Sequence, residues 1–371
     1  MVTLARNTGW AKPQKPGAPL PSEVLHAGDL VALAIDAEGV AASVLLLAPA
    51  RRERQPSKFS VERSRQWADF LQAVRDHFKT GGFIEAQTPT LVPSPGTEPF
   101  LDPFSTDWNY GSERTKLYLP TSPEFHLKKM LAQGWTRVFE MKPCFRNGER
   151  GEHHQPEFLM LEWYRAYDDL DSIADDVEEL LASVGRRFGR EIPKLQRTTM
   201  AGLFGQAFPG FTLTATTSRD ELRSLARANG VETRDSDTWD EVFFRLFLEK
   251  IEAGLGQEGP LLVRGYPPSQ AALSRIGDDG FADRFEVYWK GLELANAFHE
   301  LNDPDENRAR FADDADKKKA LGKDPVPVDE GLLRALDAGL PPSGGIALGV
   351  DRLFMALFGI EDIGETRAFP F

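Results

Sequence analysis

Small residues near the C-terminus constrain the fold of this chain more than any other part of its sequence. Residues 343–349 read Ser-Gly-Gly-Ile-Ala-Leu-Gly and run through Val-Asp-Arg into the apolar segment 353–358. Small side chains at alternate positions of a strand let another backbone or a ligand approach closely, because no bulky group intervenes. The following helix would fix Arg352 beside that approach, where its guanidinium suits a polyphosphate. A glycine-rich turn that leads into a buried helix is the alternative interpretation.

A second segment, far upstream, has the pattern of a long antiparallel hairpin. Two apolar runs, 137–145 and 158–164, flank a charged loop that is rich in glycine. Arg146 at the end of the first strand and Phe158 at the start of the second could together clamp a phosphate and stack a base. A solvated hairpin loop remains the alternative.

Three such segments occur in the order typical of one enzyme class. Arg146 with the Pro-Glu-Phe at 156–158 resembles motif 2 of the class II aminoacyl-tRNA synthetases. Residues 345–352 resemble motif 3, and residues 82–89, which follow an amphipathic helix, resemble motif 1.

Two further segments resemble the lysyl-tRNA synthetase branch of that class. They are Thr-Ser-Pro-Glu at 121–124 and Glu-Leu-Ala-Asn-Ala-Phe-His-Glu-Leu-Asn-Asp at 293–303. Within the branch, the chain is most similar to shortened ligases that attach (R)-β-lysine to a lysine of translation elongation factor P. The resemblance covers roughly residues 60–371.

The resemblance implies an α+β fold, with an antiparallel sheet flanked by helices over residues 59–371 and a helical insertion at about 195–260. Residues 1–58 would form an extension with a β-hairpin (strands 29–35 and 40–47) and a linker, too short for the anticodon-binding barrel of the branch. By resemblance, the helix before motif 1 and the motif 1 strand build a dimer interface, so we expect a homodimer; a surface helix on a monomer is the alternative.

The segment 285–294 predicts a tight hairpin with Lys290-Gly291 as its turn. Tyr288 would then lie opposite Glu293, with Glu286 diagonally beside Glu293 on the same face. Two such carboxylates repel unless a cation lies between them, which suits Mg²⁺ bridging to ATP phosphates. By resemblance, Glu286 and Glu293 are the metal-binding pair; a single carboxylate on a solvated edge is the alternative.

Three residues after this hairpin stand at every second position, so in a regular strand their side chains share one face. They are Asn296, Phe298 and Glu300. Glu293 is an odd number of positions away from them and would lie on the opposite face. Because a regular strand cannot aim both sets at one site, we expect a bulge or sharp twist near Leu294-Ala295.

By resemblance, the substrate is a diamino acid. Asn296 would hold its carboxylate and Phe298 would pack on its stem. Glu300 and Tyr164 would receive the distal ammonium, and Glu124 the other amine. The remaining residue of this set is Ser122.

Ala347 is the position that best separates the two kinds of relative. Lysyl-tRNA synthetases keep glycine there, whereas the ligases for elongation factor P have alanine, as this chain does. The added methyl group would favour a β-amino acid, but one methyl is worth only about 1–3 kcal/mol of discrimination. Leakage to α-lysine is therefore expected.

By resemblance, ATP binds at the motif 2 and motif 3 segments. Arg146, Arg352 and Glu293 would be the catalytic residues. The full ATP-binding set would be Arg146, Asn147, Glu149, His154, Gln155, Phe158, Glu293, Leu294, Gly349 and Arg352. The loop departs from the family pattern, because its acid stands one residue late at Glu149 and Gln155 replaces asparagine.

Composition excludes several other classes of function. One cysteine, Cys144, allows neither an intramolecular disulfide nor a cysteine-based zinc cage. A formal net charge of −13 disfavours a broad nucleic-acid surface, so tRNA is an unfavourable partner. The sequence has no apolar stretch of membrane-spanning length and no secretory signal at its start, so we expect a cytoplasmic protein.

The sequence therefore favours an ATP- and Mg²⁺-dependent ligase that forms an aminoacyl-adenylate of (R)-β-lysine or lysine and transfers it to elongation factor P. One alternative is a shortened lysine-activating ligase with a tRNA or another protein as acceptor. Another is a catalytically silent, synthetase-like regulator.

Overall fold

The computed structural model describes residues 2–6, 30–35, 41–48 and 60–370. The chain divides into two compact units, Met1–Lys58 and Phe59–Phe371. In the first unit, strands β1 (Val2–Arg6), β2 (Leu30–Ile35) and β3 (Ala41–Ala48) form an antiparallel sheet in the order β1-β2-β3. Strand β1 was not anticipated, and the expected turn at 36–39 and linker at 51–58 lie outside the described residues.

The second unit is built on an eight-stranded sheet that is antiparallel except at its two edges, where β4 and β9 pair in parallel with their neighbours. This confirms the predicted α+β class. Across the sheet the strands are β4 (Ile84–Glu85), β7 (Arg137–Phe145), β8 (Glu157–Ala166), β13 (Ser343–Gly349), β12 (Leu292–His299), β11 (Ala282–Trp289), β10 (Leu261–Tyr266) and β9 (Gln196–Thr199).

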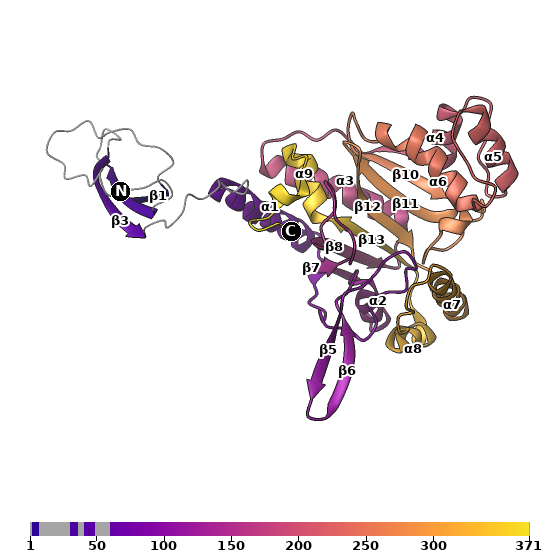
Figure 1. The fold of residues 1–371 in the computed structure, drawn as a ribbon, viewed down its shortest axis with the longest axis horizontal. Helices are drawn as coiled ribbons and strands as arrows, with labels where there is room; N and C mark the ends of the chain where they lie inside the picture. The colour runs from indigo at the N-terminus through magenta and orange to yellow at the C-terminus, as the bar shows by residue number, and fades with distance from the viewer. Residues whose placement is uncertain (1, 7–29, 36–40, 49–59, 371) are drawn as a thin grey trace. The chain divides into compact units, whose positions relative to one another are not determined.

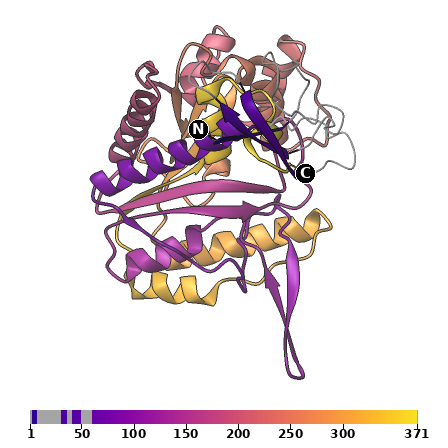
Figure 2. The same ribbon diagram turned by 90° about the vertical axis from the view of Figure 1, so that its left-hand side faces the viewer.

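Helices cover both faces of this sheet (Figure 2). Helices α1 (Val61–Thr80), α3 (Leu170–Arg187) and α9 (Val350–Phe358) pack on one face, in the largest apolar cluster of the chain. Helices α2 (Glu124–Ala132), α7 (Pro304–Ala320) and α8 (Glu330–Gly339) enclose a smaller cluster on the other face. The face that carries this smaller cluster also carries the tyrosine and acidic side chains described below.

A group of helices beside β10 has an apolar core of its own. It comprises α4 (Met200–Ala207), α5 (Arg219–Ala228) and α6 (Trp239–Lys250), and it lies within the region where a helical insertion was expected. Capping boxes start two of these helices, at Ser218 and Thr238, where each side chain and the glutamate three residues later satisfy free backbone amides. Short 3-10 turns complete the chain: η1 (Glu252–Gly254), η2 (Pro268–Gln270) and η3 (Ile363–Thr366).

A two-stranded arm of β5 (Ser105–Tyr110) and β6 (Glu113–Tyr118) projects from the second unit (Figure 1). Its exposed Trp108 and Tyr110 rings stack with centroids 6.0 Å apart. The sequence analysis did not anticipate this arm. Within the described part of the chain, no helix combines the length and the apolar character needed to cross a membrane.

The hairpin of β11 and β12 has the predicted geometry. Lys290 and Gly291 have φ angles of 54° and 75°, as a two-residue turn of the primed type requires, and Tyr288 pairs with Glu293. Val287 then pairs with Ala295, so the residue between Glu293 and Ala295 has no partner on β11. That unpaired residue is Leu294, and it confirms the expected bulge.

Candidate active site

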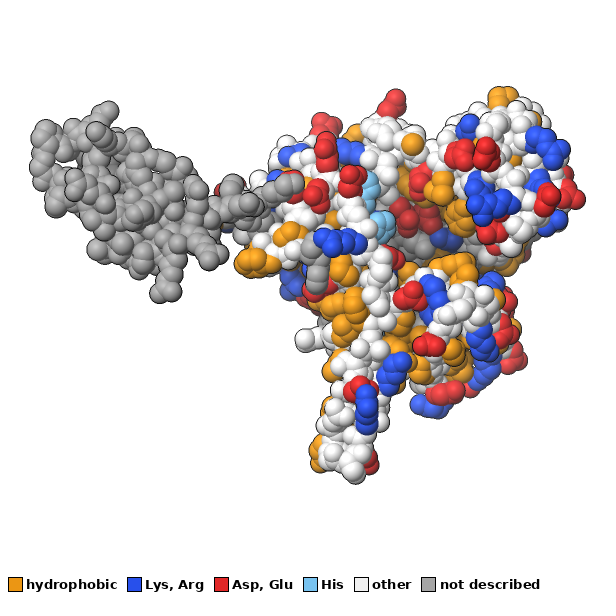
Figure 3. Space-filling model, viewed as in Figure 1, with side chains coloured by type: hydrophobic (Ala, Val, Ile, Leu, Met, Phe, Trp, Pro, Cys, Tyr) orange, Lys and Arg blue, Asp and Glu red, His pale blue; other side chains and the backbone are white. Residues whose placement is uncertain are grey.

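A cavity of about 1370 Å³ opens on the side of the sheet where α2, α6 and α7 lie. In the space-filling view the molecule is hollowed there, below the helical group of α4 to α6 (Figure 3). Two of the predicted site residues, Asn147 and Glu286, lie outside its lining. The predicted residues that line it are Ser122, Glu124, Arg146, Glu149, His154, Gln155, Phe158, Tyr164, Glu293, Leu294, Asn296, Phe298, Glu300, Ala347, Gly349 and Arg352.

The glycine-rich strand β13 forms the floor of this cavity. A Cβ atom on Gly345 would collide with the Tyr164 ring and with Oε1 of Glu300. On the opposite face of the strand, a Cβ atom on Gly344 would lie 2.6 Å from the Ile173 side chain. The small residues are therefore needed on both faces, as their spacing predicted: one face packs against α3 and the other lets the acidic side chains approach.

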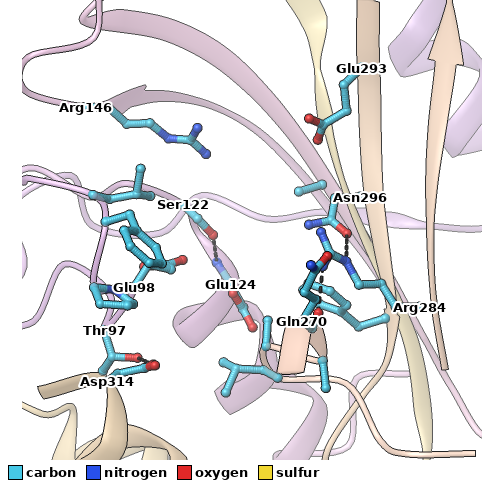
Figure 4. Close-up of a pocket in the computed structure, with 18 of the residues that line it drawn as sticks. Thr97, Glu98, Ser122, Glu124, Arg146, Gln270, Arg284, Glu293, Asn296 and Asp314 are labelled. Atoms are coloured by element: carbon cyan, nitrogen blue, oxygen red, sulfur yellow. Dashed lines mark hydrogen bonds between the residues drawn. The ribbon is translucent and has the colours of Figure 1, made fainter. Parts of the chain in front are cut away.

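The bulge at Leu294 brings both halves of β12 to the same cavity. Without it, Glu293 and Asn296 would point to opposite faces of the sheet, because side chains alternate along a regular strand. With it, both residues line the cavity. Figure 4 shows Glu293 and Asn296 on one side of this space and Arg146 facing them from the other.

Arg146 directly follows β7, with its guanidinium directed into the cavity (Figure 4). The guanidinium lies 5.0 Å from the centroid of the Phe158 ring, and it is 3.9 Å from a carboxylate oxygen of Glu149. Its Nε is buried and has no hydrogen-bond partner among the described residues. A buried donor without a partner is costly, so this atom suits an incoming anion.

Arg352 is held more firmly than Arg146. Its Nη1 donates to the backbone oxygen of Glu293 at 2.8 Å, and its Nη2 lies 2.7 Å from Nε2 of His154. Burial, with the Arg352 charge second, lowers the pKa of His154, so a neutral ring accepting from Arg352 is favoured. The neighbouring Asp351 accepts from the Leu159 amide at 2.7 Å and so ties α9 to β8.

Glu286 is part of a buried network that sequence analysis did not anticipate. One of its oxygens accepts from the hydroxyls of Tyr266 at 2.6 Å and Tyr288 at 2.5 Å, and the other accepts from Arg284. Arg284 Nε also donates to the Asn296 side chain at 2.9 Å, which fixes the orientation of that amide. Glu286 therefore acts on the cavity through Arg284.

Of the predicted metal pair, Glu293 fits a magnesium ion better than Glu286. Burial, and then the charge of Glu286, raises the pKa of Glu293 to about 7, and a divalent cation would relieve this cost. The Glu286 oxygens are already satisfied by three donors. The described residues hold no cluster of three or more metal-ligating side chains, so a magnesium ion here would take further ligands from phosphates or water. The ligand role of Glu286 stays a prediction.

The acidic end of the cavity differs from the arrangement that was expected. Tyr164 and Glu300 were expected to receive the distal ammonium, which stays a prediction, and both have partners that were not expected. The Tyr164 hydroxyl donates to Glu162 at 3.2 Å. Glu300 lies 2.5 Å from Nζ of Lys128, whose other partner is Glu124 at 2.6 Å. Sequence analysis missed both Lys128 and Glu162.

Ser122 links the Glu162 carboxylate on β8 to the backbone at the start of α2. Its hydroxyl donates to Glu162 at 2.6 Å and accepts from the Glu124 amide at 2.9 Å, at the start of α2. Burial raises the pKa of Glu162 well above its ordinary value, and raises that of Glu300 to about 7 against the lowering effect of Lys128. A buried cluster of this kind attracts cations.

Asn147 occupies the turn beside the cavity rather than its wall. Its backbone amide donates to the Asp102 oxygen at 2.7 Å, which fixes the end of β7 against the loop before β5. The assignment of Asn147 to ATP binding stays a prediction.

Replacing Glu293 with glutamine is expected to stabilise the ligand-free protein at about pH 8 and to change little at about pH 5. The folded protein holds the Glu293 proton up to about pH 7, whereas the unfolded chain releases it near its ordinary value. Ionisation of this group therefore reduces the free energy of unfolding as the pH rises through that window. Urea unfolding at the two pH values measures this, with the exposed Glu232→Gln as control. An equal effect at both pH values would contradict the expectation.

Comparison with known proteins tests the family resemblance. The profile of the family described as tRNA synthetases class II (D, K and N) matches residues 51–371. The elongation factor P–(R)-beta-lysine ligase of Vibrio vulnificus (strain YJ016) is 40% identical over 319 residues, which cover 84% of this chain and 96% of that protein. The ligase of the same name from Haemophilus ducreyi is 38% identical over 303 residues, covering 81% and 90%. The resemblance inferred from the motifs is thus confirmed, and the chain belongs to the class II tRNA synthetase family.

Proposed function

We propose that this protein is an ATP-dependent ligase that activates (R)-β-lysine, or lysine, as an aminoacyl-adenylate and transfers it to a lysine of elongation factor P. The observation that carries the proposal is the division of charge within one cavity. Two guanidinium groups, Arg146 and Arg352, stand at one end, and three carboxylates, two of them buried and one partly exposed, stand at the other. The carboxylates belong to Glu124, Glu162 and Glu300. A diamino acid with ATP beside its carboxyl group matches this division.

The activation step needs positioning and charge neutralisation more than proton transfer. The attacking carboxylate and the α-phosphate of ATP are both anions, so their repulsion must be cancelled before the oxygen reaches phosphorus. We assign this to Arg146, because its Nε lacks a partner and its guanidinium faces the cavity. Arg352 would neutralise the outer phosphates, and adenine would stack between Arg352 and Phe158. Magnesium, when bound, would add charge screening on the phosphates.

Balanced chemistry then follows for both steps. Attack by the carboxylate oxygen forms the acyl–phosphate bond and releases pyrophosphate. The neutral amine of the acceptor lysine attacks the acyl carbon, the acyl–oxygen bond breaks, AMP leaves with the electron pair, and the amine nitrogen releases one proton to the solvent. Asn296, held by Arg284 Nε at 2.9 Å, would keep the substrate carboxylate in line during the first step.

The relatives support the identity of the acceptor, since both are named elongation factor P–(R)-beta-lysine ligase. An acceptor that works in translation favours action in the cytoplasm. We also propose a homodimer formed through α1 and β4, as the resemblance implies. Light scattering on the purified chain measures this directly.

The Ala347→Gly variant is expected to lose most of its preference for (R)-β-lysine over α-lysine. Ala347 lines the cavity and pairs with Asn296 and Glu162 on the two neighbouring strands, so its methyl group lies between the carboxylate and amine ends of the site. Removing a methyl from such a pocket changes discrimination by roughly 10- to 200-fold. The ratio of kcat/KM for the two isomers in pyrophosphate exchange measures the effect. An unchanged ratio would remove Ala347 from the specificity determinants.

The acceptor is tested by the intact mass of purified elongation factor P after incubation with the protein, ATP and (R)-β-lysine. A mass increase of one lysyl group, at one lysine and only with ATP present, is expected. Labelling of tRNA instead of elongation factor P would favour the alternative of a shortened tRNA ligase. Binding of the amino acid without any turnover of ATP would favour a silent regulator.

A further inference from the structure

Lys128 is a buried cation, and the sequence analysis did not predict its place beside the acidic side chains. Its side chain is 2% exposed, and its ammonium bridges Glu124 and Glu300 at 2.6 and 2.5 Å. These carboxylates are the two that the diamino acid would use. We propose that Lys128 is a positioning residue, whose ammonium holds Glu300 charged and keeps both Glu124 and Glu300 in place for the two amino groups of the substrate. This inference rests on the proposed function.

The two oxygens of Glu300 have separate surroundings. Oε2 contacts Lys128, whereas Oε1 lies at Gly345, where the floor of the cavity has no side chain. Lys128 therefore orients the Glu300 carboxylate without occupying the oxygen that faces the space above β13. Glu124 is bound to Lys128 through Oε1 alone and also lines the cavity (Figure 4). Each carboxylate thus keeps an oxygen for a substrate amine.

Lys128 is the cation among three neighbouring carboxylates, Glu124, Glu162 and Glu300, whose negative charges repel one another. When all three are ionised, the carboxylates of Glu124, Glu162 and Glu300 carry three negative charges against the one positive charge of Lys128. The excess of two negative charges equals the number of ammonium groups in a diamino acid. Other groups facing the cluster are the Tyr164 hydroxyl, Glu98 and, at the phosphate end, Arg146. Of these groups, only Arg146 and Lys128 are cationic. Within the cluster itself, Lys128 is the group that opposes the protonation of Glu300 by burial, whereas hydrogen bonds from Ser122 and Tyr164 oppose that of Glu162.

Removing the Lys128 ammonium should raise the pKa of Glu300. Burial already raises the pKa of Glu300 to about 7, and Lys128 lowers it. In Lys128→Met the pKa of Glu300 would rise further, since loss of an opposite charge within hydrogen-bond distance raises an acid by roughly one to three units. A protonated carboxyl no longer holds an ammonium. Binding of a diamino acid to the variant is therefore expected to require a higher pH.

The experiment is a calorimetric titration of the full chain with lysine and (R)-β-lysine, from about pH 6 to about pH 9. Lys128→Met is expected to weaken binding at least about tenfold near pH 7, to shift the pH of half-maximal affinity upward by about one unit or more, and to approach the wild type at high pH. Lys129→Met is the matched control, because the adjacent Lys129 pairs with Asp329 at 2.7 Å, away from the cavity. It should leave the pH profile unchanged.

Norleucine provides a second readout, because it has the stem of lysine without the distal ammonium. Its binding should be weakened much less by Lys128→Met, so the preference for lysine over norleucine should fall about tenfold near pH 7. A purely structural role would weaken both ligands alike at every pH. That parallel loss, or an unshifted pH profile, would overturn the inference.

The wild-type titration distinguishes failure of the proposed function from failure of the proposed role of Lys128. If the wild type binds no diamino acid at any pH, the proposed function fails. If it binds them and Lys128→Met behaves as the wild type does, the role of Lys128 fails alone. If Lys128→Met does not fold, Lys128→Arg takes its place, because it retains the positive charge. Its pH of half-maximal affinity for the diamino acid must equal that of the wild type. A displaced value would contradict the inference.

Discussion

Replacing Arg146 with alanine is expected to reduce amino-acid-dependent exchange of pyrophosphate into ATP by roughly 10²- to 10³-fold, the usual cost of losing a charge-stabilising donor. The reason is electrostatic. The Nε of Arg146 is a buried donor in the cavity with no hydrogen-bond partner in the described part of the chain, and the two reacting anions must meet beside it. Binding of the amino acid at the acidic end should change little. The loss should therefore appear in kcat more than in KM for the amino acid.

Arg146→Lys separates charge from geometry, because lysine keeps the charge but cannot make paired hydrogen bonds to a carboxylate and a phosphate. It should recover only part of the lost rate. The matched control is Arg114→Ala, which removes an arginine that pairs with Asp107 on the exposed arm. Exchange at the wild-type rate in Arg146→Ala would exclude this residue from the chemistry.

Gly345→Ala is expected to reduce activity by about 100-fold or more, the scale reported for small displacements of reacting groups. The new methyl group would overlap the Tyr164 ring and Oε1 of Glu300, so both side chains would have to move. Overpacking of this kind typically costs about 1–3 kcal/mol in the free energy of unfolding. Here the loss should appear mainly as weaker binding of the diamino acid. Calorimetry together with thermal unfolding measures both.

Gly205→Ala is the control for that substitution. It adds the same methyl group in α4, where the nearest atom would be 3.8 Å away. It should leave activity unchanged and should stabilise the helix slightly. If Gly345→Ala bound lysine as tightly as the wild type, the floor of the cavity would not be where the amine end of the substrate lies.

The parts of the site that could be predicted are those that follow from local rules. The turn at Lys290-Gly291 has a two-residue signature, and the bulge at Leu294 followed from the conflict in parity between Glu293 and Asn296. The spacing of small residues in 343–349 predicted the close approach at Gly345. Each of these depends on neighbours in the sequence, so the chain alone was sufficient.

The parts that could not be predicted depend on contacts between distant segments. Lys128 follows Glu124 by four residues on a helix, a spacing that is usually an exposed ion pair of small effect. Only the packing of α2 against β8 and α8 buries Lys128 beside Glu300. Likewise, the network that holds Glu286 needs Tyr266 from β10, and no local pattern links these two residues.

The central claim is that one cavity joins ATP to a diamino acid, and amino-acid-dependent pyrophosphate exchange tests it most directly. The purified chain with ATP, Mg²⁺ and (R)-β-lysine should exchange pyrophosphate rapidly, α-lysine should support slower exchange, and norleucine should support almost none. Exchange that is absent with every diamino acid, or that proceeds equally well with norleucine, would contradict the account.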